Sequence, residues 1–153
     1  MSHNPHHPVT VQQYQDIVVP TDGSDGANYA AEHALALAES LDATVHAVSV
    51  VEDSWATQRD QMRTSPEEEA ASAVGAIEER GIERDVAVDS TTLSGTPAQS
   101  ILTYVDENNA DLIVMSTHGR TGLKQVVFGS IAEDVVRNAS VPVLTVRPPE
   151  WED

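Results

Sequence analysis

Two short loops carry most of the residues in this sequence whose chemistry suits an anionic ligand. The first spans residues 20–24 (PTDGS), and the second spans residues 116–122 (STHGRTG) and leads to a Gly-Ser pair at 129–130. Glycine lets a backbone amide approach a ligand closely, and Arg120 and Lys124, the only lysine of the chain, add positive charge. These residue types favour a phosphate site, although the same composition also suits a long loop that ends in a helix cap.

The standard phosphate-binding fingerprints are missing from the sequence. There is no G-x-x-x-x-G-K-[ST] pattern, and no G-x-G-x-x-G pattern follows a predicted strand. A P-loop nucleoside triphosphatase and an ordinary dinucleotide-binding domain are therefore disfavoured.

Short runs rich in β-branched residues alternate with longer helical patterns from residue 16 onward. The predicted strands are 17–19, 44–51, 85–91, 111–117 and 141–146. The predicted helices are 28–41, 65–80, 96–108 and 130–138. A Ser-Pro-Glu signal starts the second helix, and Gly81 is predicted to stop it. This alternation predicts an α/β fold with a five-stranded parallel sheet and helices on both faces, Rossmann-like in architecture. Ligands of such sheets bind beyond the carboxyl ends of the strands, where both loops lie.

The length of 153 residues corresponds to about one domain. We expect a flexible N-terminal arm at 1–13, a single domain at 14–149 and a tail at 150–153. The sequence contains no cysteine, which excludes disulfides and thiolate sites. No apolar run approaches the ~20 residues of a membrane span, and the first residues lack the apolar core of a signal peptide. We therefore expect a cytoplasmic protein with no membrane partner.

The charge balance is strongly acidic, with 8 Lys and Arg against 25 Asp and Glu and a net charge of −17. The scarcity of cations argues against a nucleic-acid partner, because neutralising phosphates needs clustered Lys and Arg. An acid excess can simply keep a protein soluble. Combined with the scarcity of lysine, it favours a halophilic adaptation, because a Debye length of ~3 Å at 1 M salt screens the self-repulsion.

Two stretches of the chain, DIVVPTDGSDGANYAAEHALALA at 16–38 and DLIVMSTHGRTGLKQVVFGSIAEDVVRNASVPVLTV at 111–146, resemble the universal stress protein family. Nucleotide-binding members of that family carry a Gly, two residues, a Gly, nine residues and then Gly-Ser or Gly-Thr. Here Gly119 stands at the second glycine and the pair at 129–130 closes the motif, whereas Ser116 replaces the first glycine. The chain therefore resembles the ATP-binding branch, with an adenine nucleotide alpha hydrolase-like fold, and its acid excess points to a haloarchaeal member.

The resemblance also implies the cofactor and the residues that bind it. The expected ligand is ATP, or AMP or ADP, and Mg²⁺ is a candidate companion. Asp22 corresponds to an aspartate near the ribose and phosphates, and it is the candidate magnesium ligand. Pro20, Thr21 and Val50 correspond to positions that line the adenine. The full predicted set of nucleotide-binding residues is Pro20, Thr21, Asp22, Val50, Met115, Ser116, His118, Gly119, Arg120, Gly122, Gly129, Ser130 and Ile131, and no catalytic residue is predicted.

Three other functions share this architecture. One is a slow, Mg²⁺-dependent ATP hydrolase, for which the sequence shows no close base–nucleophile pair. Another is a phospho-receiver domain, which needs clustered acids that Asp22 lacks. The third is an ATP pyrophosphatase with a Ser-Gly-Gly-x-Asp-Ser loop, to which residues 21–26 bear a superficial likeness. The leading hypothesis is a regulatory, stress-response protein that binds an adenine nucleotide.

The last predicted strand, 141–146, is apolar and predicted to lie at an edge of the sheet. An exposed apolar edge is a liability unless it is covered or paired. Members of the family dimerise through this strand, so the resemblance implies a two-fold symmetric homodimer.

Overall fold

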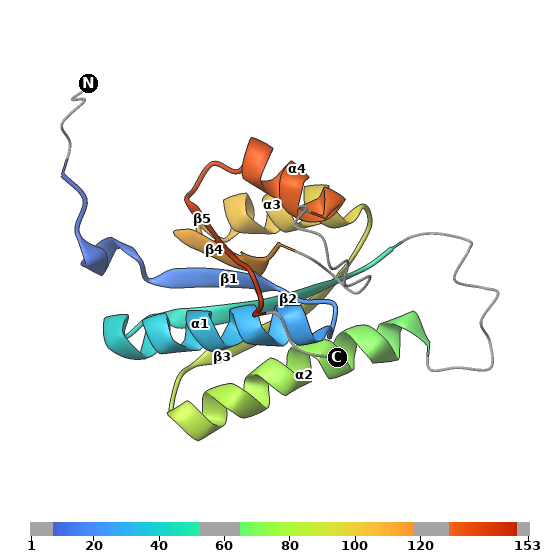
Figure 1. Cartoon of the computed structure of the whole chain (residues 1–153), viewed down its shortest axis with the longest axis horizontal. Coiled ribbons are helices and arrows are strands. Elements are labelled where there is room, and N and C mark those ends of the chain that lie inside the picture. Colours follow the sequence, from blue (N-terminus) through green and yellow to red (C-terminus); the bar gives the residue numbers. More distant parts are fainter. Residues whose placement is uncertain (1–7, 53–64, 118–128, 150–153) are drawn as a thin grey trace.

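The central element of the fold is a five-stranded parallel sheet in the order β3-β2-β1-β4-β5 (Figure 1). The computed structural model describes residues 8–52, 65–117 and 129–149. The strands are β1 (Asp16–Pro20), β2 (Thr44–Val51), β3 (Val88–Ser94), β4 (Leu112–Ser116) and β5 (Val143–Val146). The helices are the 3-10 turn η1 (Val11–Gln13), α1 (Asp25–Leu41), α2 (Pro66–Arg84), α3 (Pro97–Glu107) and α4 (Ser130–Asn138). The predicted α/β class and parallel sheet are confirmed.

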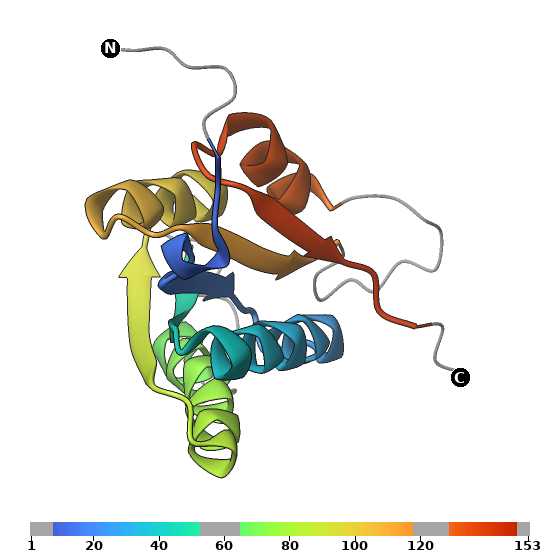
Figure 2. The ribbon, with the colours of Figure 1, turned by 90° about the vertical axis from the view of Figure 1, so that its left-hand side faces the viewer.

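Helices cover both faces of the sheet, with α1 and α2 on one side and α3 and α4 on the other (Figure 2). Side chains of β1 alternate between the two faces. Ile17 and Val19 pack in one core cluster with Leu35 of α1 and Ile77 of α2. Val18 belongs to the other cluster, which side chains of α3 and α4 complete. Burial of both faces explains why the central strands β1 and β4 carry continuous apolar runs rather than alternating ones.

Strand β1 lies at the centre of the sheet and is the point at which the strand order reverses. The register places Ile17 opposite Val45 of β2 and opposite Leu112 of β4. Because the strands are parallel, the loops that follow β1 and β4 both leave from the carboxyl ends of the strands. Open α/β sheets bind their ligands there, at the point where the strand order reverses.

Helix α2 continues past Gly81, where the sequence predicted its end, and stops at Arg84. Asp85 takes the left-handed conformation, with φ 62° and ψ 43°, and its N–H donates to the carbonyls of Gly81 and Ile82. Aspartate visits this conformation more readily than most residues, so Asp85 fills the position that the prediction assigned to a glycine. Strand β3 accordingly begins at Val88, three residues later than predicted.

Gly81 serves close packing between α2 and β3 instead. A Cβ at Gly81 would lie 2.4 Å from Val88 Cγ2 and 3.0 Å from the carbonyl oxygen of Val86.

We expect Gly81→Ala to lower the free energy of unfolding by about 1–3 kcal/mol through overpacking, despite the ~1 kcal/mol better helix propensity of alanine. Gly75, in the same helix, has no atom within 4 Å of such a Cβ, so Gly75→Ala should stabilise the protein by about 0.5–1 kcal/mol. Urea unfolding of both variants tests this, and equal stabilisation of both would contradict it.

The two ends of the described chain differ in detail from the expectation. Strand β5 is shorter than the predicted 141–146, because Pro142 has no N–H to donate to the ladder. At the other end, residues 11–13 form a short 3-10 turn within the stretch predicted to be a flexible arm. Residues 1–7 and 150–153 lie outside the described residues, so the boundaries of the arm and tail stay predictions.

Candidate functional site

The loop after β1 is held by one hydrogen bond to β2 and by two within itself. The Thr21 N–H donates to the Val48 carbonyl at 2.8 Å, which ties the loop to β2. Thr21 Oγ1 accepts from the Gly23 N–H at 3.0 Å, and Asp22 Oδ1 accepts from the Ser24 N–H at 2.9 Å. Gly23 has a φ of 82°, a conformation that glycine adopts without strain. One carboxylate oxygen of Asp22, the predicted ribose or magnesium contact, therefore already shapes this turn.

Helix α1 starts directly after this loop with its first turn capped. Ser24 is the N-cap residue, and its Oγ accepts from the Ala27 N–H at 3.1 Å. Such a cap satisfies one of the backbone donors that an α-helix leaves unpaired at its start. The start of α1 is thus partly occupied by its own side chain.

The end of β4 is joined to the start of α4 across the segment 118–128. The Thr117 N–H donates to the Val146 carbonyl of β5 at 3.0 Å, and the Thr117 carbonyl accepts from the Gly129 N–H at 2.7 Å. Ser116 and Thr117 are both buried. The N–H of Gly129, expected from the sequence to be available to a ligand, is therefore engaged within the protein.

Helix α4 differs from α1 in having no side-chain cap. Its N-cap is Gly129, with φ −67° and ψ 159°, and no side chain caps this end in the described part of the chain. The first intrahelical bond here is donated by the Glu133 N–H to the Gly129 carbonyl. The N–H groups of Ser130 and Ile131, both exposed residues, have no acceptor within the helix. With the helix dipole, these groups form an end that suits an anion.

The predicted adenine-lining residues also lie at the carboxyl ends of the strands. Pro20 ends β1 and pairs in register with Val48, two residues before the half-buried Val50 on β2. Met115, near the end of β4, is 5% exposed and belongs to the core cluster against which Val50 packs. The structure thus brings the described members of the predicted set to the carboxyl ends of β1, β2 and β4 and to the start of α4. His118, Gly119, Arg120 and Gly122 lie outside the described residues.

The described residues, 8–52, 65–117 and 129–149, offer neither a metal cluster nor a membrane-spanning helix. Within them, no group of three or more His, Asp or Glu side chains could hold a metal ion. No helix in the same ranges is long and apolar enough to cross a membrane.

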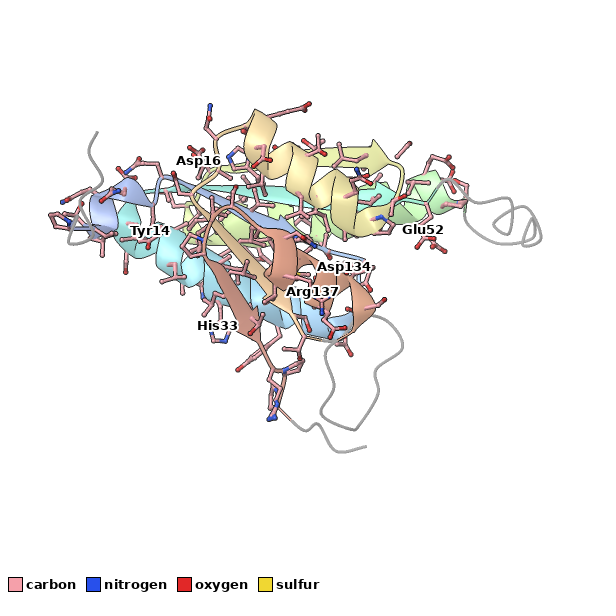
Figure 3. All side chains as sticks on the ribbon, turned by 90° about the horizontal axis from the view of Figure 1, so that it is seen from above. Tyr14, Asp16, His33, Glu52, Asp134 and Arg137 are labelled. Carbon is pink, nitrogen blue, oxygen red and sulfur yellow. The ribbon has the colours of Figure 1, made fainter. Side chains whose placement is uncertain are left out.

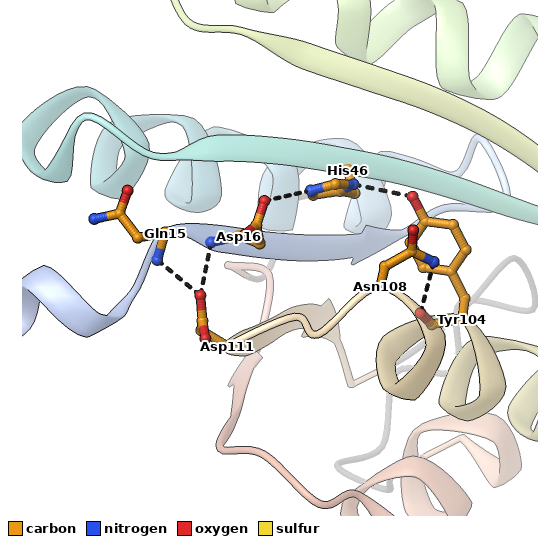
Figure 4. A network of polar contacts seen from close by, with 6 residues as sticks. All are labelled: Gln15, Asp16, His46, Tyr104, Asn108 and Asp111. Atoms are coloured by element: carbon orange, nitrogen blue, oxygen red, sulfur yellow. Dashed lines mark hydrogen bonds and ion pairs between the residues drawn. The ribbon is translucent and has the colours of Figure 1, made fainter.

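A polar network around the buried His46, which the sequence did not reveal, lies at the amino-terminal ends of the strands (Figure 4). His46 of β2 lies 2.9 Å from Asp16 Oδ1 through Nε2 and 2.9 Å from the Tyr104 hydroxyl through Nδ1. An ionised carboxylate can only accept, so Nε2 donates to Asp16, and Nδ1 of the neutral ring accepts from Tyr104. Asp111 accepts from the N–H groups of Gln15 and Asp16, both at 2.9 Å. A histidine within a mostly apolar strand was the signal available in the sequence.

This network lies far from the candidate anion site. Asp16, at the start of β1, and Glu52, just after β2, lie at opposite ends of the sheet (Figure 3). The network therefore joins the amino ends of the strands to α3, while the candidate ligand site occupies the carboxyl ends.

The family model of the universal stress protein family matches residues 13–147. The chain belongs to the universal stress protein family. It is 38% identical over 149 residues to universal stress protein MJ0531 of Methanocaldococcus jannaschii, covering 91% of this chain and 85% of that one.

Solved structures of this family share the fold. The structure of MJ0577 superposes with a TM-score of 0.77 at 26% identity, covering 90% of this chain and 99% of that one. A universal stress protein in complex with cAMP has a TM-score of 0.68 at 24% identity, covering 87% and 97%. At that identity the second likeness shows the fold alone.

Proposed function

We propose that this universal stress protein binds an adenine nucleotide, with ATP as the expected ligand, in a regulatory stress-response role. The observation that carries the proposal is the uncapped start of α4, which the hydrogen bond between Gly129 and Thr117 holds beside the end of β4. This helix start lies at the switch point of the sheet, where α/β folds bind nucleotides. The family membership supports the choice of an adenine nucleotide. We also propose a cytoplasmic location, where ATP is abundant.

The phosphates would contact the backbone of Ser130 and Ile131, whose N–H groups have no acceptor within α4. Gly119 and Arg120, motif residues outside the described ranges, are proposed to contact the phosphates as well. Ser116, which replaces the first glycine of the motif, is 7% exposed. Its side chain is therefore accommodated in the protein at the end of β4.

The adenine would lie against Pro20 and Val50, with Thr21 beside them. The N–H of Thr21 is donated to Val48, so a backbone contact from Thr21 to the adenine edge would use its carbonyl. Asp22 would reach the ribose or a nucleotide-bound Mg²⁺ with a carboxylate that also closes its turn.

Ligand identification and calorimetry test the proposal together. Mass spectrometry of the purified protein should reveal a carried adenine nucleotide. Calorimetry with ATP, AMP, cAMP and GTP, each with and without Mg²⁺, should show binding of at least one adenine nucleotide and weaker binding of GTP. Failure of every adenine nucleotide to bind would refute the proposal. A phosphate-release assay on the same samples separates binding from the competing proposal of slow ATP hydrolysis.

We further propose a two-fold homodimer through β5. This strand ends the sheet, and the side chain of its Leu144 is 40% exposed. Light scattering in molar KCl should give the mass of a dimer, and Leu144→Asp should give a monomer, because pairing would desolvate the carboxylate. Ile82, an exposed apolar residue on α2, provides the control, since Ile82→Asp should remain dimeric. A wild-type monomer at micromolar concentration would contradict the proposal.

The halophilic adaptation is a separate proposal with its own prediction. The net charge is −17, and acids such as Glu67, Glu68 and Glu69 lie exposed in the first turn of α2. Salt at 1 M shortens the Debye length to ~3 Å and screens their repulsion. The melting temperature should rise between low and molar KCl, and an unchanged value would rule this adaptation out.

A further inference from the structure

Strand β3 forms the edge of the sheet opposite β5. It is seven residues long and pairs with β2 along its whole length, from Val45↔Val88 to Val51↔Ser94. In Figure 2 it stands at the margin of the sheet, with α3 near its carboxyl end. Within residues 8–52, 65–117 and 129–149, no strand pairs with its outer side. The strand contains no proline or lysine, the residues that commonly protect such edges.

Two hydrogen bonds identify which backbone groups of β3 face outward. The Val45 N–H donates to the Ala87 carbonyl, and the Gly95 N–H donates to the Val51 carbonyl, both at 3.0 Å. Residues of a parallel strand direct their N–H and C=O alternately to one neighbour and the other. The odd-numbered residues of β3 therefore bond to β2, and the even-numbered ones, such as Ser90 and Thr92, direct their N–H and C=O away from the sheet.

A groove of about 280 Å³ lies between the end of β3 and α3. Leu93 contributes from β3, while Thr103, Tyr104 and Glu107 contribute from α3. The Tyr104 hydroxyl is held at 2.9 Å by the buried His46. This hydrogen bond orients the Tyr104 side chain, which lines the groove, without any partner.

We propose that β3 and this groove bind an extended basic peptide, which adds to the sheet as a further strand. Main-chain hydrogen bonds to the even-numbered residues of β3 would hold it, and alternate side chains would lie over the groove. The charges select a basic partner. Glu107 lines the groove, Asp89 is exposed on β3, and the chain carries a net charge of −17. A second copy of the chain would bring the same acids together, which disfavours β3–β3 pairing.

The test uses a labelled hexapeptide of alternating lysine and valine, with its binding followed by fluorescence anisotropy. Two forms that are N-methylated at alternate residues carry the same charge but block opposite edges of the added strand. One form should bind like the parent peptide and the other about tenfold more weakly or worse. A peptide with glutamate in place of lysine should also lose about tenfold or more. Equal binding of both methylated forms would show charge attraction alone, and no binding of the parent would also overturn the proposal.

Matched variants of the protein test the same edge from the other side. Thr92→Pro removes an outward N–H without touching the ladder to β2, a position where edge strands accept proline, and Thr92→Val keeps that N–H. The parent peptide should bind Thr92→Val normally and Thr92→Pro about tenfold more weakly. Glu107→Gln should weaken binding of the lysine peptide while the melting temperature is unchanged. If Thr92→Pro unfolds, the methylated peptides still decide. A wild-type dimer that Thr92→Pro breaks and Leu144→Asp does not would assign this edge to a second copy and overturn the proposal.

Discussion

Ser130→Pro should bind ATP about tenfold more weakly than Ser130→Ala does, which is a difference of about 1.4 kcal/mol. Proline at this position removes the first N–H of α4, whereas alanine keeps it and removes only the hydroxyl. Ser130→Ala itself should lose no more than one hydrogen bond to a charged group, ~1.5–3 kcal/mol. The difference between the two variants therefore reports the backbone contact to the phosphates.

The local backbone makes this substitution a fair test. Proline is well tolerated at the first position of a helix, and the residue before it must be extended. Gly129 already has φ −67° and ψ 159°. The melting temperature of Ser130→Pro should therefore match that of Ser130→Ala, and calorimetry with ATP supplies the affinities. Equal affinity of the two folded variants would remove the start of α4 from the site.

His46→Leu should lower the free energy of unfolding by about 1–3 kcal/mol, a large effect for a single substitution. His46 is 8% exposed, and its imidazole forms hydrogen bonds with both Asp16 and Tyr104. Leucine removes both hydrogen bonds, each worth about 0.5–1.5 kcal/mol net. The Asp16 side chain is 38% exposed, so water can replace the imidazole there. Urea unfolding measures the change as a shift in the midpoint.

His33 on α1 provides the matched control. It is exposed, and its ring meets Tyr29 edge-on at 4.9 Å. His33→Leu should change the free energy of unfolding by no more than about 0.5 kcal/mol. Similar losses in the two variants would mean that the network around His46 contributes no more to stability than a surface contact.

The sheet was predictable because its central strands β1 and β4 are buried on both faces. Runs such as 17–19 and 112–115 are apolar without interruption, and helical patterns separate them, a combination that few folds other than a parallel sheet accommodate. The end of α2 was not predictable from the same rules. Glycine is the usual stop, but Gly81 is needed for its approach to Val88, and Asp85 ends the helix instead. A local rule was overridden by contacts with a strand that lies later in the chain.

The location of the candidate site, at the carboxyl ends of the strands, could be predicted from the topology. Its motif could be predicted from the family resemblance. The hydrogen-bonding state of its atoms followed from neither. The N–H groups of Thr21 and Gly129 are engaged by the carbonyls of Val48 and Thr117, and these pairings depend on how distant segments meet. Sequence spacing places a glycine at the start of α4, but it does not show that Thr117 engages the N–H of Gly129 while those of Ser130 and Ile131 have no acceptor within the helix.

The hydrogen bond from Gly129 to Thr117 also bears on how the segment 118–128 can vary among proteins of this type. It joins Thr117 and Gly129, the two residues that flank the segment, at 2.7 Å. The entropy of closing a flexible loop rises slowly with its length, by only about 0.6 kcal/mol for each doubling. Insertions or deletions in this segment should therefore leave β4 and the start of α4 in place. Ligand preference could thus diverge by changes in loop length while the anion-binding end of the helix is inherited unchanged.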